Sequence, residues 1–221
     1  MFEDAKQSTG VFPAQHLEAA RVLGRLPRHY FQAVGSGTGA IGVFEAVLRL
    51  HGDRRFGGAV MPRLHLSQSS PFLPIYQAWR DRSAVDPAAS WHRPGEEVYA
   101  SVLANRNPPY ALRGGVRDAL AASGGDVYSV GAGSAHAAGM IFADAEGIDL
   151  DPAAAVAAAS LAQAVAAGAV AASDLVLLNV TGGGFERLRR DYGLQHLVPQ
   201  LVLEPGEVEG AAPIEALRAT A

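Results

Sequence analysis

Short apolar runs of strand length alternate along the chain with longer stretches whose apolar residues recur at helical spacing. Four runs have the length and composition typical of strands: His29–Val34, Ala59–Gln68, Asp126–Val130 and Asp174–Val180. Helical spacing is found at His16–Leu26, Ile41–Leu50, the later part of Ser69–Trp79, Gly115–Ala122, Ser134–Glu146 and the alanine-rich stretch Pro152–Ala172. Strands that alternate with helices predict an α/β fold in three layers, with a mostly parallel sheet between helices on both faces.

The same pattern sets the expected domain boundaries. Residues 1–27 read as an N-terminal extension with a first helix, residues 28–203 as one α/β domain, and residues 204–221 as a flexible tail. The stretch Asp81–Pro94 is polar and contains proline, which predicts a surface excursion. The run DLVLLNV, Asp174–Val180, is almost continuously apolar, which is typical of a parallel strand buried on both faces.

Composition excludes several classes of function. The net charge is −4 and the basic residues, almost all arginine, are scattered, so we expect no nucleic-acid partner. No cysteine is present and the seven histidines are dispersed, so we predict no metal site. The first residues lack the plan of a signal peptide, and no stretch is apolar enough to span a bilayer. These features predict a cytoplasmic protein with no membrane partner.

A glycine-rich loop joins the first predicted strand to the next helix. Its residues are Gly35, Ser36, Gly37, Thr38 and Gly39. Glycines let the backbone approach a ligand, and the following helix offers unpaired amides to an anion, so the loop suits a phosphate. The glycine spacing also fits a dinucleotide fingerprint, but the end of the second strand, Leu66-Ser67-Gln68, lacks the acid that would hold a ribose. A tight turn without any ligand remains a third interpretation.

Two further loops are candidates for chemistry. Thr181 and the three glycines after it follow the last predicted strand directly. The loop NRNPPYALRGG is polar and fixed by prolines, and its arginines, Arg106 and Arg113, could bind an anionic substrate. A solvated surface turn explains the same residues equally well. Ser134 and His136 lack the turn of a nucleophile elbow, and we assign them no catalytic role. We expect His65, inside a strand, to line the core or a cleft.

Five motifs occur in an order found in a known enzyme family. They are YFQAVGSGTGAIGVFEA, RLHLSQSSPFLPIYQAW, NRNPPYALRGGVRDAL, EGIDLDPAAAVAAASL and DLVLLNVTGGG. Together, over about residues 15–192, they resemble the threonine synthase and cysteate synthase branch of the fold-type II pyridoxal phosphate enzymes, and cysteate synthase more closely. The resemblance implies that residues 28–203 form the domain that binds the cofactor phosphate, through Gly35, Ser36, Gly37, Thr38 and Gly39. It implies that the hydroxyl group of Thr181 faces the pyridine nitrogen.

The resemblance also implies a reaction and substrate contacts. The reaction is β-replacement on O-phosphoserine, in which phosphate leaves and sulfite adds to give cysteate. We expect Arg106 and Arg113 to contact the phosphate or sulfonate of this anionic amino acid, because guanidinium groups match such oxyanions.

The chain departs from the family pattern at the lysine that forms the Schiff base with the cofactor. Its single lysine, Lys6, lies in EDAKQSTG, without the Ser-x-Lys context of the family, and we assign no catalytic residue in this chain. One hypothesis is that a lysine-bearing small-domain partner chain completes the enzyme. Because a domain without this part would expose apolar surface beside the cleft, we expect an obligate partner or a homo-oligomer, and aggregation of the isolated chain. The alternative is a non-catalytic module of the same fold that binds a phosphate metabolite or regulates another protein.

Overall fold

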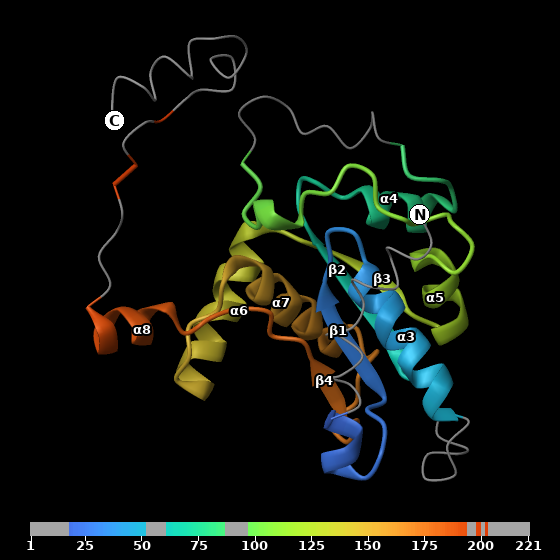
Figure 1. Ribbon diagram of the computed structural model, residues 1–221, viewed down its shortest axis with the longest axis horizontal. Coiled ribbons are helices and arrows are strands. Elements are labelled where there is room, and N and C mark those ends of the chain that lie inside the picture. Colours follow the sequence, from blue (N-terminus) through green and yellow to red (C-terminus); the bar gives the residue numbers. More distant parts are fainter. Residues whose placement is uncertain (1–17, 52–60, 87–96, 194–197, 200–201, 203–221) are drawn as a thin grey trace. The chain divides into compact units, whose positions relative to one another are not determined.

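The computed structural model describes residues 18–51, 61–86, 97–193, 198–199 and 202 of the 221-residue chain (Figure 1). The chain divides into two compact units, Met1–Gly184 and Phe185–Ala221. The second unit contains the helix α8 (Phe185–Tyr192), and the first contains all other helices and strands described below. Residues 1–17 and 203–221 lie outside the described residues, so the expected extension and tail, with Lys6, stay predictions.

One four-stranded sheet forms the centre of the first unit. Its strands are β1 (His29–Ala33), β2 (Arg63–Ser69), β3 (Asp126–Val130) and β4 (Val176–Leu178). They lie in the order β3-β2-β1-β4, and each pair of neighbours is parallel. The register places His29 opposite both Arg63 and Val176, so β1 lies between strands far apart in the sequence. The predicted parallel sheet is confirmed.

Helices cover both faces of this sheet (Figure 1). One face carries α3 (Thr38–His51), α4 (Pro74–Asp81) and α5 (Val116–Ser123). The other face carries α7 (Pro152–Ala166), against which α6 (Ala132–Glu146) packs. A short 3₁₀ turn, η1 (Ser101–Leu103), precedes α5. The predicted layers, with helices on both faces of a parallel sheet, are confirmed.

Successive residues of β1 point to opposite faces of the sheet, as the pleat requires. Tyr30 packs in the core beneath α3, α4 and α5, whereas Ala33 packs in the core beneath α6 and α7. All five residues of the strand are buried, because β1 has a neighbour on each side and helices above and below. The strand that leads into the glycine loop is therefore fully enclosed by the sheet and its helices.

The alanine-rich helix α7 lies between the sheet and α6. Its residues 153–157 are all buried, which is the pattern of a helix enclosed on several sides, and alanine lets its backbone approach closely. Asp151 caps the helix, since its Oδ1 accepts a hydrogen bond from the amide of Ala154 at 2.7 Å. The helix ends at Ala166 rather than Ala172, because Gly168 adopts a φ of +69°.

Three element boundaries differ from the predictions. Helix α3 begins at Thr38 instead of Ile41, because the Ser36 side chain accepts from the Thr38 amide at 3.3 Å and starts the helix inside the glycine loop. Strand β2 begins at Arg63, and residues 59–60 of the predicted strand lie outside the described residues. Strand β4 has three half-buried residues, because among the described strands it pairs only with β1 at the edge of the sheet.

Candidate functional site

The glycine loop and the Thr181 loop leave the same edge of the sheet. β1 and β4 are neighbouring parallel strands, with Phe31 opposite Leu178. Beyond the strand, the amide of Asn179 donates a hydrogen bond to the carbonyl oxygen of Phe31 at 2.9 Å. The glycine loop follows β1, and Thr181 comes two residues after Asn179. Ligands of open α/β sheets bind at this carboxyl edge of the strands.

The backbone of the glycine loop leaves little room for a side chain at two positions. Gly37 has a φ of +78°, and a methyl group there would lie 2.5 Å from Cγ2 of Val116. A methyl group on Gly39 would lie 2.6 Å from the side-chain nitrogen of Gln32. The two glycines therefore hold the loop tightly against α5 on one side and against β1 on the other.

The start of α3 offers donors to an anion. The first bond that closes the helix runs from the amide of Ile41 to the carbonyl of Gly37, at 3.2 Å, so the amides of Gly39 and Ala40 precede the helical ladder. The hydroxyl groups of Ser36 and Thr38 lie 3.0 Å apart beside them. No acidic residue stands in the first turn of this 14-residue helix. The donors, the dipole and the glycine backbone together fit a phosphate group.

A buried polar network connects the two loops beneath the sheet edge. Asn179 Nδ2 donates to the hydroxyl oxygen of Tyr30 at 3.1 Å, and that hydroxyl donates to Gln32 Oε1 at 3.2 Å. Gln32 in turn packs under Gly39. Burial raises the pKa of Tyr30, partly offset by the hydrogen bond from Asn179, so the phenol stays protonated and keeps donating.

Sequence reasoning did not assign a role to these three residues. The available signal was the alternation of Tyr30 and Gln32 on one face of a strand that leads directly into a glycine loop. Buried polar side chains on such a face need hydrogen-bond partners, and the sequence shows only that Tyr30 and Gln32 could bond to each other. Asn179 could be added only once β4 was known to pair with β1.

The loop that carries Thr181 is held by the turn before α7. The amide of Asp151 donates to the carbonyl of Gly182 at 3.1 Å, and the amide of Gly184 donates to the carbonyl of Asp149 at 2.8 Å. A methyl group on Gly182 would collide with the carboxylate of Asp151. Thr181 itself is exposed, so its hydroxyl group is accessible to a ligand at this edge.

The segment with Arg106 and Arg113 begins and ends at the glycine loop. The carbonyl oxygen of Leu103 would be 3.1 Å from a methyl group on Gly35, and Val116 packs against Gly37. Both arginine side chains are exposed between these two anchors. The structure thus brings the segment to the candidate site, and a contact between either arginine and a substrate stays a prediction.

The remaining candidates from the sequence fall outside this site. Gln68 is the second-last residue of β2, where a dinucleotide fold would place an acid. Its Oε1 accepts hydrogen bonds from the amides of Ile75 and Tyr76, at 2.9 and 3.0 Å. Nε2 of Gln68 is buried without a partner among the described residues. His65 is fully buried in the core.

Ser134 and His136 form no nucleophile–base pair. Ser134 is exposed, and the ring of His136 lies 4.7 Å from that of Tyr99, centroid to centroid. Within the described residues, no cluster of three or more His, Cys, Asp or Glu could hold a metal ion. Nor does any helix in the described part of the chain combine the length and the apolar character needed to cross a membrane.

Comparison with solved structures supports the fold. The chain is similar to the processed form of threonine deaminase isoform 2 from Solanum lycopersicum, with a TM-score of 0.56 and 15% identity, covering 84% of this chain and 49% of that one. It is also similar to an L-serine ammonia-lyase from Rhizomucor miehei, with a TM-score of 0.55 and 14% identity, covering 82% of this chain and 55% of that one.

Comparison with curated proteins gives much higher identity. The chain is 50% identical over 182 residues to the cysteate synthase of Methanosphaerula palustris, which covers 80% of this chain and 43% of the relative. It is 50% identical over 195 residues to the cysteate synthase of Methanoregula boonei, which covers 86% of this chain and 46% of the relative. The chain thus spans less than half the length of these two relatives.

The family comparison covers both loops of the site. Residues 14–182 match the model of the family described as pyridoxal-phosphate dependent enzyme, a range that includes the glycine loop and Thr181. The phosphate-binding geometry at the start of α3 fits the phosphate of that cofactor. The chain belongs to the pyridoxal-phosphate dependent enzymes, with the fold-type II architecture and a sequence similar to cysteate synthase.

Proposed function

We propose that this chain holds pyridoxal phosphate in an enzyme that, like cysteate synthase, replaces the phosphate of O-phosphoserine with sulfite. One observation carries the proposal. The glycine loop after β1 and the Thr181 loop after β4 have different roles in the family, and they leave neighbouring strands at the same end of the sheet. A buried polar network joins the residues that precede these two loops. If the glycine loop were only a tight turn without a ligand, the Thr181 loop would not need to lie beside it.

Each loop has its own task in this proposal. The amides at the start of α3 and the hydroxyl groups of Ser36 and Thr38 bind the phosphate of the cofactor. Thr181 places a neutral hydroxyl group at the ring nitrogen, which leaves that nitrogen largely unprotonated. When bound, pyridoxal phosphate supplies the electron sink for bond cleavage at the substrate.

The substrate class follows from charge and geometry at the same edge. Arg106 and Arg113 extend from a segment anchored at both ends to the glycine loop. Their guanidinium groups bind the oxyanions of an amino acid that carries a phosphate or sulfonate on its β-carbon. This assignment makes Arg106 and Arg113 substrate-binding residues and leaves the cofactor to the two loops.

The lysine that holds the cofactor comes, in this proposal, from a partner chain with a small domain. The sequence contains one lysine, Lys6, and its surroundings do not match the Ser-x-Lys segment of the family. The chain also matches less than half of each cysteate synthase reported above. In this proposal, the partner supplies the amine and a proton relay at the substrate's α-carbon.

Phosphate recognition can be tested without the lysine. Pyridoxine 5′-phosphate has the ring and the phosphate of the cofactor but no aldehyde, so it cannot react with an amine. We expect calorimetric titration of the full chain to show binding at least about 100-fold tighter than that of unphosphorylated pyridoxine, or about 2.7 kcal/mol. Gly39→Ala should abolish this preference, because the added methyl group displaces Gln32.

A matched control separates binding from folding. Gly133 in α6 has no neighbour within 4 Å of an added methyl group, so Gly133→Ala should bind pyridoxine 5′-phosphate like the parent chain. Equal affinities for pyridoxine and its phosphate in the parent chain would refute the assignment of the glycine loop.

The partner is tested by complementation. The full chain is mixed with the part of the Methanosphaerula palustris cysteate synthase that it does not match, and cysteate formation from O-phosphoserine and sulfite is measured. We expect turnover only in the mixture, and loss of the visible cofactor band after borohydride reduction. Turnover by the chain alone, abolished by Lys6→Ala, would show that Lys6 is the catalytic lysine. Pyridoxine 5′-phosphate binding without turnover in any mixture would favour the non-catalytic module.

A further inference from the structure

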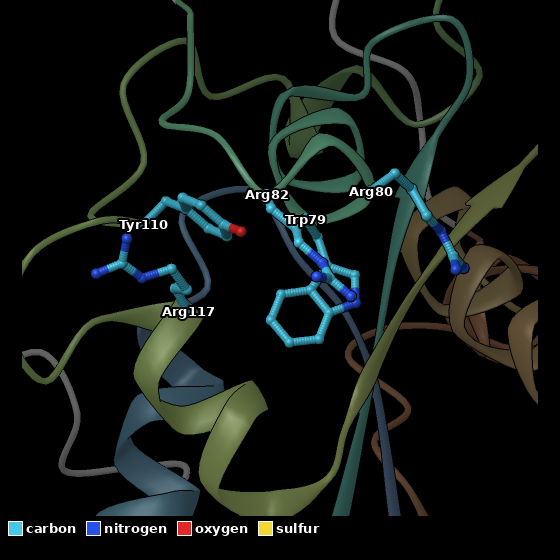
Figure 2. A pocket seen from close by; sticks show the side chains of 5 residues that line it. All are labelled: Trp79, Arg80, Arg82, Tyr110 and Arg117. Carbon is cyan, nitrogen blue, oxygen red and sulfur yellow. The ribbon is translucent and has the colours of Figure 1, made fainter.

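A pocket of about 450 Å³ lies beside the end of α4, and none of its lining residues belongs to the glycine loop or the Thr181 loop. It is lined by Trp79, Arg80, Arg82, Tyr110 and Arg117 (Figure 2). Pockets of this size accept small organic ligands. The guanidinium groups and aromatic rings of these residues favour a flat, anionic ligand.

The three arginines of the pocket differ in whether a carboxylate group already lies close to their guanidinium groups. Arg80 lies 3.3 Å from a carboxylate oxygen of Asp126 and donates to the carbonyl of Val127 at 3.1 Å. Arg117 lies 3.7 Å from Asp118. Arg82 has no ion pair among the described residues, so its charge is available to an anion.

The backbone at Arg82 is itself unusual. This residue ends α4 with a φ of +54°, a left-handed conformation that glycine adopts at far lower cost. Its amide closes the helix by donating to the carbonyl of Ala78. An arginine at this position accepts backbone strain, and the conformation places its guanidinium group at the pocket.

Tyr110 presents a hydroxyl group to the same pocket. Its side chain is 1% exposed, and its hydroxyl group has no hydrogen-bond partner among the described residues. Figure 2 shows the hydroxyl oxygen pointing away from the backbone, toward Arg82 and Trp79. This hydroxyl group can therefore donate a hydrogen bond to an oxygen of a ligand in the pocket.

Trp79 provides a rigid apolar wall. Its indole Nε1 donates to Oδ1 of Asp126 at 2.9 Å, which fixes the ring relative to the strand β3. The indole face thus remains for contact with an apolar, flat ligand surface. Because Asp126 also binds Arg80, the same carboxylate orients two of the five lining residues.

The pocket extends toward the edge of the sheet opposite the cofactor site. Trp79 and Arg80 are tied to Asp126, which is the first residue of β3, whereas the glycine loop follows the last residue of β1. Because the strands are parallel, Asp126 lies at the amino end of the sheet and the glycine loop lies at its carboxyl end. On the other side of the pocket, Arg117 follows Val116, which packs against Gly37. A ligand held by Trp79 and Arg82 therefore lies on the side of the pocket away from the glycine loop.

We propose that this pocket is a second ligand site for a small, flat ring compound with a phosphate or carboxylate group. The oxyanion lies between Arg82 and the Tyr110 hydroxyl group, and the ring lies against Trp79. The proposal goes beyond the cofactor site and does not depend on it.

Fluorescence of Trp79 tests the proposal directly. The only other tryptophan is Trp91, so a Trp91→Phe variant of the full chain has a single reporter. Phenyl phosphate and benzoate are titrated as the two anion sources, with inorganic phosphate and neutral phenol as partial ligands. We expect saturable quenching by at least one ring anion, about tenfold tighter than either partial ligand, and the tighter anion identifies the oxyanion. Absence of saturable quenching by both ring anions would overturn the proposal.

Substitutions then locate the site. Arg82→Gln should weaken binding of the ring anion at least tenfold, and Tyr110→Phe should weaken it about fivefold. Tyr110→Phe should leave the circular dichroism spectrum unchanged, because the Tyr110 hydroxyl group has no hydrogen-bond partner to lose among the described residues. Arg49→Gln, on the exposed surface of α3, is the matched control and should bind like the parent. Gly39→Ala should also leave this binding unchanged, which separates it from the cofactor site. Equal affinity in Arg82→Gln, Tyr110→Phe and the parent would exclude the pocket.

Discussion

The side-chain amide of Asn179 donates a hydrogen bond to the hydroxyl group of Tyr30 across 149 positions of sequence, at a distance of 3.1 Å. The two residues belong to the ends of the chain segment that forms the sheet. Tyr30 precedes the glycine loop, and Asn179 precedes Thr181. The bond therefore couples the position of the phosphate-binding loop to that of the loop at the ring nitrogen.

Removal of the Tyr30 hydroxyl group should loosen both loops. Tyr30→Phe leaves Nδ2 of Asn179 and Oε1 of Gln32 without this partner in a buried environment. We expect a loss of about 1–3 kcal/mol in the free energy of unfolding, measured by urea titration, and weaker binding of pyridoxine 5′-phosphate. Tyr192→Phe, at an exposed position, is the control and should change neither quantity. An unchanged affinity in Tyr30→Phe would mean that the network does not position the loops.

The buried His65 should make stability depend on pH. Burial, followed by the nearby positive charges of His29 and Arg63, lowers the pKa of His65 from 6.5 to about 3. The folded state thus keeps the ring neutral, while the unfolded chain takes up a proton below pH 6.5. Stability is fully present above that pH and falls as the pH falls toward 3. Between pH 7.5 and 5.0 the loss should reach about 2 kcal/mol.

A variant isolates this contribution. His65→Gln removes the titrating group, although it also changes contacts with His29 and Tyr128, to which His65 is hydrogen-bonded at 2.9 Å each. Its free energy of unfolding should therefore be lower at pH 7.5 but should change less between pH 7.5 and 5.0. His136→Gln on the exposed side of α6 should keep the pH dependence of the parent. The same pH dependence in His65→Gln and in the parent would assign the effect to other groups.

Asp151 should serve both α7 and the Thr181 loop. Asp151→Ala removes the helix cap at Ala154, which costs about 1 kcal/mol of stability in thermal or urea unfolding. Asp151→Asn keeps a capping oxygen and should retain most of this stability. Because the turn at Asp151 also holds Gly182, the alanine variant should bind pyridoxine 5′-phosphate more weakly than the asparagine variant. Equal affinities of the two variants for pyridoxine 5′-phosphate would mean that the Asp151 cap does not affect the Thr181 loop.

Thr181 should act through its hydroxyl group and not through its methyl group. Thr181→Ser keeps the hydroxyl and should bind pyridoxine 5′-phosphate as the parent does. Thr181→Ala should weaken it about 5- to 10-fold, which corresponds to one neutral hydrogen bond of about 1 kcal/mol. Because Thr181 is exposed, neither substitution should change the free energy of unfolding. A serine variant as weak as the alanine variant would remove Thr181 from the cofactor contacts.

The parts of the fold that depend on local pattern were predictable from the sequence. Strand β3 was predicted at Asp126–Val130, where the structure has it, and β1 to within one residue. Glycine stands on both sides of β3, and Pro27 and Gly35 stand near the two ends of β1. The start of α3 was missed because the helix begins inside the glycine loop, through the Ser36 side chain. The extent of β4 was missed because an apolar run does not show how many neighbours a strand has.

The candidate site shows the same division. The glycine loop and Thr181 could be placed from motifs, since each lies at a strand end that the sequence reveals. The network of Asn179, Tyr30 and Gln32 could not be placed, because it requires the pairing of β1 with β4. Likewise, Trp79 and Tyr110 read as ordinary aromatic residues, and only the tertiary structure places them with three arginines at one pocket.

The central position of β1 has a consequence for synthesis on the ribosome. β1 is made first among the four strands, but its partner β4 is made last. At translation rates of about 5–20 residues per second, the nascent chain spends several seconds with β1, β2 and β3 available and one side of β1 unpaired. An open backbone edge on an apolar strand is a template for other chains. We therefore expect the yield of soluble protein in cells to be higher when slow codons follow the β4 coding segment than when they precede it.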